Sequence, residues 1–188
     1  MFSIKTYNDS YKVDWNNFVD ISKNSTFLFK REFMDYHAEK FEDYSLLIFY
    51  NSDLIALFPC NIRDGEVYSH EGLSYGGVIV KSDLKFLKYL ELFTYLLKYF
   101  NEKSIKKLYI KQIPSIYNSN FNGELDYLSF VTGAKIYRRD IISVIDMQNE
   151  NKISKDRLQG YKRGKKNKLE IKETDDLDEF WNSILIPT

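Results

Sequence analysis

The chain has 188 residues, of which 44% are hydrophobic, and this is enough for one well-buried domain or for one domain and part of another. The 27 Lys and Arg residues balance the 27 Asp and Glu residues, which excludes a protein that attracts polyanions over its whole surface. The single cysteine, Cys60, excludes an internal disulfide, and the sequence shows no signal peptide or run of about eighteen apolar residues. We therefore expect a soluble, cytoplasmic protein without a membrane span.

The first third of the sequence predicts a strand, two helices and a meander of three strands. Alternating polarity predicts a strand over 2–7, and helical spacing of apolar residues predicts helices up to about Ser22 and over 31–37. Strand-like runs follow, at 44–50, at 54–62 with an interruption by Pro59 near its far end, and at 66–69. The last two are joined by Asp64 and Gly65, whose composition is typical of a type I′ hairpin turn.

The middle of the sequence predicts two helices and two strands. Ser82 is the expected cap of a long helix through about Phe100, and a strand over 107–113 follows. A short helix over 122–132 is expected to end at Gly133, and alternating polarity predicts a long strand over 134–147. This order predicts an α/β fold in which helices cover a mixed sheet.

A glycine-rich stretch, 69–77, follows the last strand of the meander. It holds three glycines within six positions, which let the backbone adopt positive φ and approach a ligand: Gly72, Gly76 and Gly77. It also holds four side chains that donate, accept or transfer protons: His70, Glu71, Ser74 and Tyr75. A binding loop and a simple turn at the end of a strand both explain this composition.

From residue 151 the sequence is first basic and then acidic. The basic residues include Arg157, Lys162, Arg163, Lys165 and Lys166, and the acidic residues lie between 170 and 179. A solvated surface of mutually compensating charges is one interpretation, and binding of phosphate, RNA or another anion is the other.

The last twenty residues resemble the first twenty. Both read as a strand, a polar or acidic turn, and a helix with Trp-Asn followed by two apolar residues. The first strand, 2–5, leads to Trp15 and Asn16, and the second, 169–172, leads to Trp181 and Asn182. The sequence therefore predicts a lobe over 1–150, a basic arm over 151–168 and the start of a second, incomplete lobe over 169–188. An exposed apolar helix at this end requires a partner.

Together these features resemble the GNAT acyltransferase fold, and more closely the N-terminal lobe of the Fem-type aminoacyl and acyl transferases and related proteins of bacterial polysaccharide gene clusters. The resemblance rests on four runs: 15–19, 26–37, 69–77 and the basic run 157–168. It implies a twisted mixed sheet with helices on both faces. It also implies acyl transfer to a cell-envelope saccharide or peptide precursor, with acyl-CoA or aminoacyl-tRNA as donor. The stretch 69–77 lacks the basic residue of a GNAT pyrophosphate loop and contains Glu71, so we expect no cofactor in this lobe.

The same resemblance places an acceptor site beside 69–77. His70 and Glu71 are the candidate catalytic residues, with His70 as a general base, although a role in fixing the turn is the alternative. The candidate substrate contacts are Arg31, Tyr36, His37, Gly72, Ser74, Tyr75, Gly76 and Gly77. The candidate anion or RNA contacts are Arg157, Lys162, Arg163, Lys165 and Lys166. Two histidines and one cysteine leave no recognisable zinc site.

The expected partner is a small-molecule acceptor, or a saccharide linked to a lipid or a nucleotide. A tRNA and a second copy that pairs through the incomplete lobe are further expectations. The alternative function is a non-catalytic binding module, or a remnant that pairs with another chain.

Overall fold

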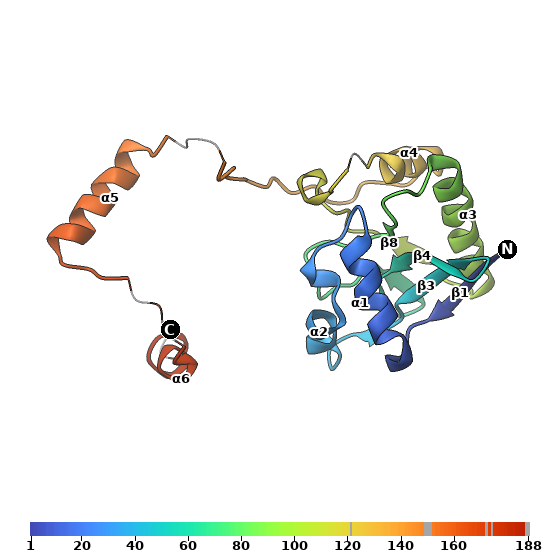
Figure 1. Ribbon diagram of the computed structural model, residues 1–188, viewed down its shortest axis with the longest axis horizontal. Helices are drawn as coiled ribbons and strands as arrows, with labels where there is room; N and C mark the ends of the chain where they lie inside the picture. The colour runs from blue at the N-terminus through green and yellow to red at the C-terminus, as the bar shows by residue number, and fades with distance from the viewer. Residues whose placement is uncertain (121, 149–151, 172, 174, 187–188) are drawn as a thin grey trace. The chain divides into compact units, whose positions relative to one another are not determined.

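Two small sheets and the helices around them form the first of two units in the computed structural model, Met1–Ile136, and the second unit is Tyr137–Thr188 (Figure 1). The structure describes residues 1–120, 122–148, 152–171, 173 and 175–186, and for His37 it describes the backbone alone. Each unit is described by itself below.

The first sheet is antiparallel throughout and is buried on both faces. Its strands, in spatial order, are β1 (Phe2–Thr6), β3 (Leu46–Tyr50), β4 (Asp53–Phe58) and β7 (Ile79–Val80). Leu46 and Ile48 face one hydrophobic cluster, whereas Leu47 between them faces another. Because side chains of a strand alternate between its faces, the continuous apolar run of β3 supplies both clusters.

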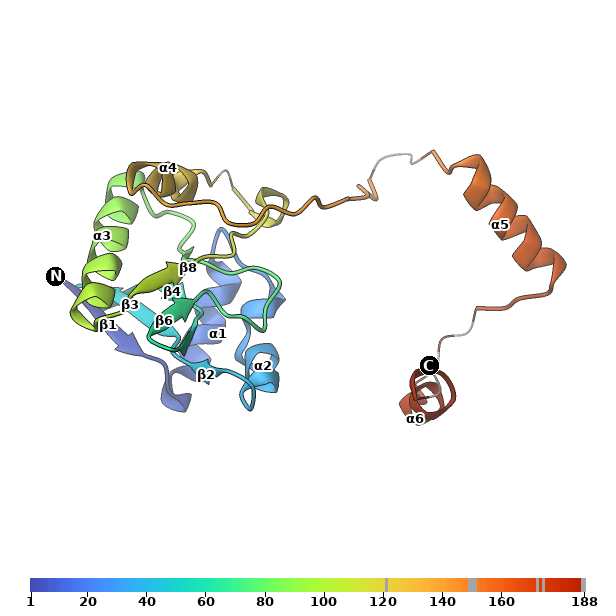
Figure 2. The same cartoon turned by 180° about the vertical axis from the view of Figure 1, so that it is seen from behind.

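The chain passes from the first sheet into the second sheet at Pro59, directly after β4. Its strands, in order, are β2 (Glu42–Asp43), β5 (Asn61–Arg63), β6 (Glu66–Tyr68) and β8 (Lys107–Tyr109). The pair β6–β8 is parallel, and the other pairs are antiparallel (Figure 2). Asp64 and Gly65 join β5 to β6 with φ angles of 55° and 74°. Both angles are positive, as a type I′ turn requires, so the predicted hairpin turn is confirmed.

Helices cover both faces of the first sheet. On one face, α1 (Lys12–Ile21) packs Trp15, Phe18 and Val19 against the sheet, next to the short helix α2 (Arg31–Met34). On the other, α3 (Phe86–Glu102) buries the stripe Tyr89, Leu92, Phe93, Leu96 and Phe100, and α4 (Glu124–Val131) adds Leu128. The predicted mixed α/β fold with helices on both faces is therefore confirmed.

Four short 3₁₀ helices connect these elements. They are η1 (Asp9–Tyr11), η2 (Phe27–Phe29), η3 (Asp35–His37) and η4 (Ser115–Tyr117). The helix expected over 31–37 is thus one α-helical turn that tightens into a 3₁₀ turn.

The second unit contains the helix α5 (Lys155–Lys166), the short helix α6 (Leu177–Phe180) and a π-helical turn, η5 (Trp181–Leu185). The hydroxyl of Ser154 accepts a hydrogen bond from the backbone N–H of Arg157, and the carboxylate of Asp176 accepts one from Glu179. Both are N-terminal caps, which satisfy donors that the first helical turn leaves unpaired. The basic run thus forms a helix over Lys155–Lys166.

Two expectations about element boundaries are wrong, and the expected interruption of the run 54–62 at Pro59 is confirmed. The long helix begins at Phe86 and not near Ser82, because 81–84 form a turn in which Lys81 accepts the N–H of Leu84. Pro59, which has no N–H to give to a ladder, separates β4 from β5. The strand expected over 107–113 ends at Tyr109, although a single bridge joins Gln112 to Gly76.

Two expected strands do not form. The described residues 134–147 and 169–171 belong to neither a strand nor a helix, and Lys172, the last residue of the second prediction, lies outside the described residues. Alternating polarity is a local property, whereas a strand requires a partner for its backbone hydrogen bonds. Among the described residues of the predicted second lobe, the helical part forms and the strand does not.

Candidate functional site

The glycine-rich stretch interrupts a strand instead of ending one. Tyr68 pairs with Asn61, and after ten intervening residues Ile79 pairs with Leu57 on the same antiparallel partner. Ten residues, 69–78, therefore lie opposite only three, 58–60, in the manner of a very long β-bulge. Bulges commonly aim side chains at a site, and we call 69–77 the bulge loop.

The base of the bulge loop is closed by the chain that follows β8. Ser69 donates its backbone N–H to Tyr109 O at 2.8 Å, and its hydroxyl accepts the N–H of Lys111 at 2.8 Å. At the other end, Gly76 donates its N–H to Lys111 O at 2.6 Å. A Cβ on Gly76 would lie 2.3 Å from the carbonyl oxygen of Ser69, so this closure requires glycine.

Glu71 is held firmly within the fold. Its backbone N–H donates to the carbonyl oxygen of the Asn61 side chain at 2.7 Å, and the Asn61 amide donates to the Glu71 carboxylate at 2.9 Å. Arg63 adds an ion pair at 2.8 Å. These three contacts make Glu71 the anchor of the bulge loop, and its catalytic role stays a prediction.

His70 is 3% exposed and has a φ of +61°, which a residue with a Cβ adopts only rarely. Its N–H donates to Tyr68 O, and its ring lies edge-on to Phe41 at 5.7 Å between ring centres. The burial and the tight turn give His70 a role in shaping the bulge loop. Its predicted role as a general base is not tested by this geometry.

A lysine that the sequence did not single out also fixes the bulge loop. The ammonium group of Lys111 donates to the carbonyl oxygens of Glu71 and Leu73. Asn61 was missed as well, although an Asn between apolar strand residues is a weak signal of a buried polar contact. Asn61 acts from β5 and Lys111 from the chain that follows β8, so no motif inside 69–77 could reveal them.

Two aromatic pairs, which are linked by the hydrogen bond of Tyr75 to Thr26, form what we call the aromatic shelf: Tyr75 of the bulge loop with Tyr117, and Phe27 with Phe33. The hydroxyl of Tyr75 donates to Thr26 at 3.0 Å, and its ring lies 5.2 Å from Tyr117 at an angle of 31°. Phe27, the next residue after Thr26, meets Phe33 at 5.5 Å. Phe27 and Tyr117 are 67% and 47% exposed, and Ser74 beside Tyr75 is exposed too. The shelf therefore offers rings and hydroxyls to a ligand.

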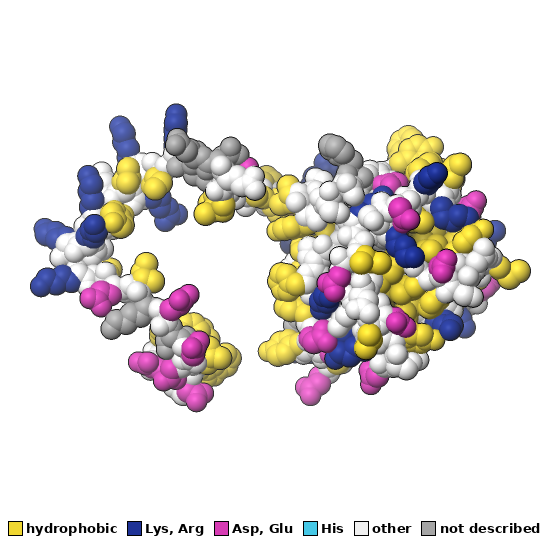
Figure 3. Space-filling view, viewed as in Figure 1, with side chains coloured by type: hydrophobic (Ala, Val, Ile, Leu, Met, Phe, Trp, Pro, Cys, Tyr) yellow, Lys and Arg dark blue, Asp and Glu magenta, His cyan; other side chains and the backbone are white. Residues whose placement is uncertain are grey.

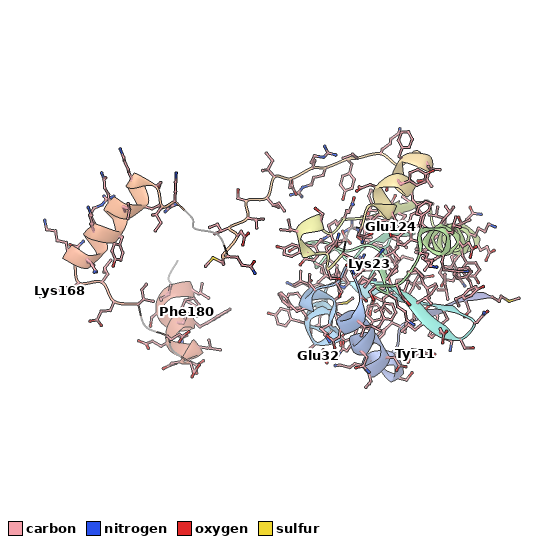
Figure 4. All side chains as sticks on the ribbon, turned by 45° about the horizontal axis from the view of Figure 1, so that its top comes forward. Tyr11, Lys23, Glu32, Glu124, Lys168 and Phe180 are labelled. Carbon is pink, nitrogen blue, oxygen red and sulfur yellow. The ribbon has the colours of Figure 1, made fainter. Side chains whose placement is uncertain are left out.

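A small hollow near Gly76 has a lining rich in amide side chains: Asn24, Gln112, Asn118 and Asn122. The Asn24 amide donates to Val78 O at 2.8 Å, and its oxygen accepts the N–H of Val80 at 3.0 Å. Asn24 thus pairs with the edge of β7 as a strand backbone would. Its neighbour Lys23 forms an ion pair of 2.5 Å with Glu124 (Figure 4), and the backbone of Ser119 binds Lys23 O. Side chains of the protein itself therefore occupy the space beyond the edge of β7.

The structure gives the other predicted substrate contacts different positions. Arg31 is 3% exposed, forms ion pairs with Asp35 and Asp43 at 2.7 and 2.5 Å, and lies 3.7 Å over the Tyr7 ring. Burial raises the pKa of Tyr7, although the charge of Arg31 opposes this shift. Tyr36 is largely exposed, and the side chain of His37 lies outside the described residues. Tyr75, Gly76 and Gly77 therefore lie in the bulge loop, whereas the buried Arg31 belongs to a cluster of ion pairs.

The predicted anion contacts all lie on α5 and are exposed: Arg157, Lys162, Arg163, Lys165 and Lys166. The last three are in or next to the final turn, where positive charge stabilises the carbonyl end of a helix. Anion or RNA binding stays a prediction.

Within the part of the chain that the structure describes, no group of three or more His, Cys, Asp and Glu side chains is arranged to hold a metal ion. No helix there has the length and hydrophobicity that crossing a bilayer requires.

Fold and site together define a mixed α/β unit whose candidate binding surface is a bulge loop with an aromatic shelf. Comparisons with family models and with curated proteins found no match. Among solved structures, the chain is similar to the ribosomal-protein-S18-alanine N-acetyltransferase from Escherichia coli, with a TM-score of 0.42 and 11% sequence identity. The match covers 57% of this chain and 64% of that enzyme's chain, which is less than two thirds of the enzyme.

Proposed function

We propose that the first unit is the acceptor-binding lobe of an acyl or aminoacyl transferase that acts on a cell-envelope saccharide or peptide precursor. The reaction class is supported by the resemblance of four sequence runs to Fem-type proteins, 15–19, 26–37, 69–77 and 157–168. The binding role is supported by one structural observation, the exposed aromatic shelf beside the bulge loop.

The chemistry of the shelf suits a saccharide. The apolar face of a sugar ring packs on an aromatic ring, as Tyr117 and Phe27 offer, while sugar hydroxyls require polar partners at the edge. Ser74 supplies an exposed hydroxyl there. Because the Tyr75 hydroxyl already binds Thr26, the ring of Tyr75 is fixed before a ligand arrives, which lowers the entropy cost of binding.

The donor is proposed to come from outside this lobe. Acyl-CoA carries phosphates, and the bulge loop offers them the Glu71 carboxylate and no Lys or Arg within 69–77. The space beyond the edge of β7 is lined by Lys23, Asn24 and Ser119 of the chain itself. The residues present do not fit CoA, so no step is assigned to it. The lobe contributes by positioning the acceptor.

The test is a titration of the full chain with UDP-N-acetylglucosamine and, separately, with acetyl-CoA, followed by NMR or calorimetry. We expect the sugar nucleotide to bind and Tyr117→Ala to weaken it several-fold, while acetyl-CoA does not bind. Tyr127→Ala is the matched control, since Tyr127 is similarly exposed on α4 outside the shelf. Equal binding by both variants would refute the shelf as the site. Binding without transfer in the presence of an aminoacyl-tRNA or acyl-CoA would favour a non-catalytic binding module.

A further inference from the structure

The C-terminal helical segment, α6 followed by η5, exposes a stripe of large apolar side chains. They recur at helical spacing and are all at least 45% exposed: Leu177, Phe180, Trp181, Ile184 and Leu185. In Figure 3, hydrophobic side chains gather on one side of this segment and acidic side chains on another. We call these five residues the C-terminal stripe.

Helix α1 of the first unit carries an equivalent apolar stripe, which is buried. Trp15, Phe18 and Val19 of α1 have the same spacing as Trp181, Ile184 and Leu185, and they are at most 3% exposed. Trp15 also donates its indole N–H to Phe29 O at 2.7 Å. The same pattern is thus fully covered in α1 and left exposed in the C-terminal segment by the described residues of the second unit.

The charges around the stripe favour a protein surface over a membrane. Asp175, Asp176, Asp178 and Glu179 lie at the start of the segment, and its polar side carries no Lys or Arg. Helices that lie on anionic bilayers have basic polar faces, so an acidic face opposes that kind of binding. The partner required is an apolar surface with a basic rim.

Helix α5 has this character. Leu158 and Tyr161 lie one turn apart and are both exposed, and Lys165 stands over the Tyr161 ring at 5.2 Å. Its twelve residues include six Lys or Arg and only one acidic residue, Asp156. Basic α5 and the acidic C-terminal segment are therefore complementary in charge, and each presents apolar side chains.

We propose that the second unit mediates homodimer formation, in which α5 and the C-terminal segment of two copies pack as a four-helix assembly. The two exposed apolar side chains on α5 are fewer than the five of the C-terminal stripe, so α5 of one copy does not cover the whole stripe. A two-fold assembly brings the two stripes together in its centre and places each acidic segment beside a basic α5. This inference is independent of the proposed acceptor site in the first unit.

Trp181 makes the proposal directly measurable. The chain has two tryptophans, Trp15 and Trp181, and Trp15 is fully buried, so a change in emission on association reports Trp181. We expect the mass of the full chain, measured by light scattering, to shift from monomer to dimer as concentration rises to about 100 µM. The Trp181 emission should shift to shorter wavelength over the same range.

Variants separate the contacts. Trp181→Asp should keep the chain monomeric, and reversal of two α5 charges by Lys162→Glu with Lys166→Glu should weaken the dimer at least several-fold. Asp178→Lys with Glu179→Lys should also weaken it, and the four changes together should restore it, because opposite charges are again paired. Ile21→Asp is the control for adding an exposed acid, since Ile21 is an exposed apolar residue of the first unit.

Several outcomes would overturn the proposal. One is a monomer at every concentration, whether the Trp181 emission indicates exposure of the indole to water or its burial within one copy. Another is a dimer that Trp181→Asp leaves intact. Concentration-independent mass with binding of the wild-type chain to tRNA or to phosphatidylglycerol vesicles would assign α5 to those partners instead.

Discussion

Asn61 and Glu71 contact each other through both the backbone and the side chain of Glu71. The Asn61 carboxamide accepts the Glu71 N–H at 2.7 Å and donates to the Glu71 carboxylate at 2.9 Å. Asn61 is 1% exposed and lies on β5, so a buried residue of a strand fixes Glu71, the third residue of the bulge loop. The position of the loop is therefore determined mainly from outside the loop.

The first prediction concerns this contact. Asn61→Ala removes both hydrogen bonds and leaves a partly buried N–H on Glu71 unpaired, so we expect the free energy of unfolding to fall by about 1–3 kcal/mol. Amide hydrogen exchange should also accelerate over 69–77 more than over α3. Asn17→Ala is the control, because Asn17 is exposed on α1 and its loss should change stability little. Unchanged exchange in the loop would show that Asn61 does not hold it.

The sequence located the loop but not its structural context. Three glycines and the preceding hairpin indicate a loop at 69–77, and the structure confirms the hairpin turn. After the loop, the chain pairs again at Ile79 with the antiparallel segment 57–61, with which it last paired at Tyr68. No local sequence pattern encodes this long-range pairing. For the same reason the sequence missed Lys111 and Asn61, which act across strands.

The second prediction tests the closure of the loop at Gly76. Its φ is not in the positive region, so Gly76→Ala acts through the contact of its Cβ with the carbonyl of Ser69. Backbone atoms cannot move aside as a side chain tip can, and we expect a loss of about 1–3 kcal/mol in urea unfolding. Gly123→Ala meets no atom within 4 Å and serves as the control, with equal or higher stability expected. Equal effects of the two substitutions would contradict the close approach.

The third prediction compares a buried with an exposed ion pair. The Lys23 and Glu124 side chains are 5% and 16% exposed, so Glu124→Gln leaves a buried ammonium group without its counter-charge. We expect a loss of about 3–5 kcal/mol, whereas Glu91→Gln, which breaks the partly exposed pair with Lys88, should cost about 0–1 kcal/mol. Thermal unfolding at low and high salt provides the comparison. A similar cost for both would mean that water reaches Lys23.

Helix positions were easier to predict than helix ends and strand partners. The apolar stripes of α1 and α3 are long and strongly periodic, so both helices were predicted near their observed places. Serine commonly caps helices, and Ser82 was therefore expected to do so. The preceding residue, Lys81, instead forms an isolated β-bridge with Ser22, and the helix starts at Phe86, four residues after Ser82. The alternating run 134–147 has strand composition and forms no strand among the described residues, because composition does not supply a partner.

The fourth prediction concerns stability at high pH. Burial raises the pKa of Tyr89 well above its usual value of 10.0, and the nearby charge of Glu124 raises it further. In the unfolded chain the phenol loses its proton near its usual pKa, while the folded protein retains it. The folded state therefore binds more protons above that pH, and stability falls as pH rises.

Tyr89→Phe removes the titrating group, so its melting temperature should decline less between about pH 9 and pH 11 than that of the wild type. Tyr127→Phe, at an exposed position of α4, should follow the wild-type profile. Parallel profiles for all three proteins would show that Tyr89 ionises equally in both states, and that its burial in the α3 stripe does not govern the alkaline stability.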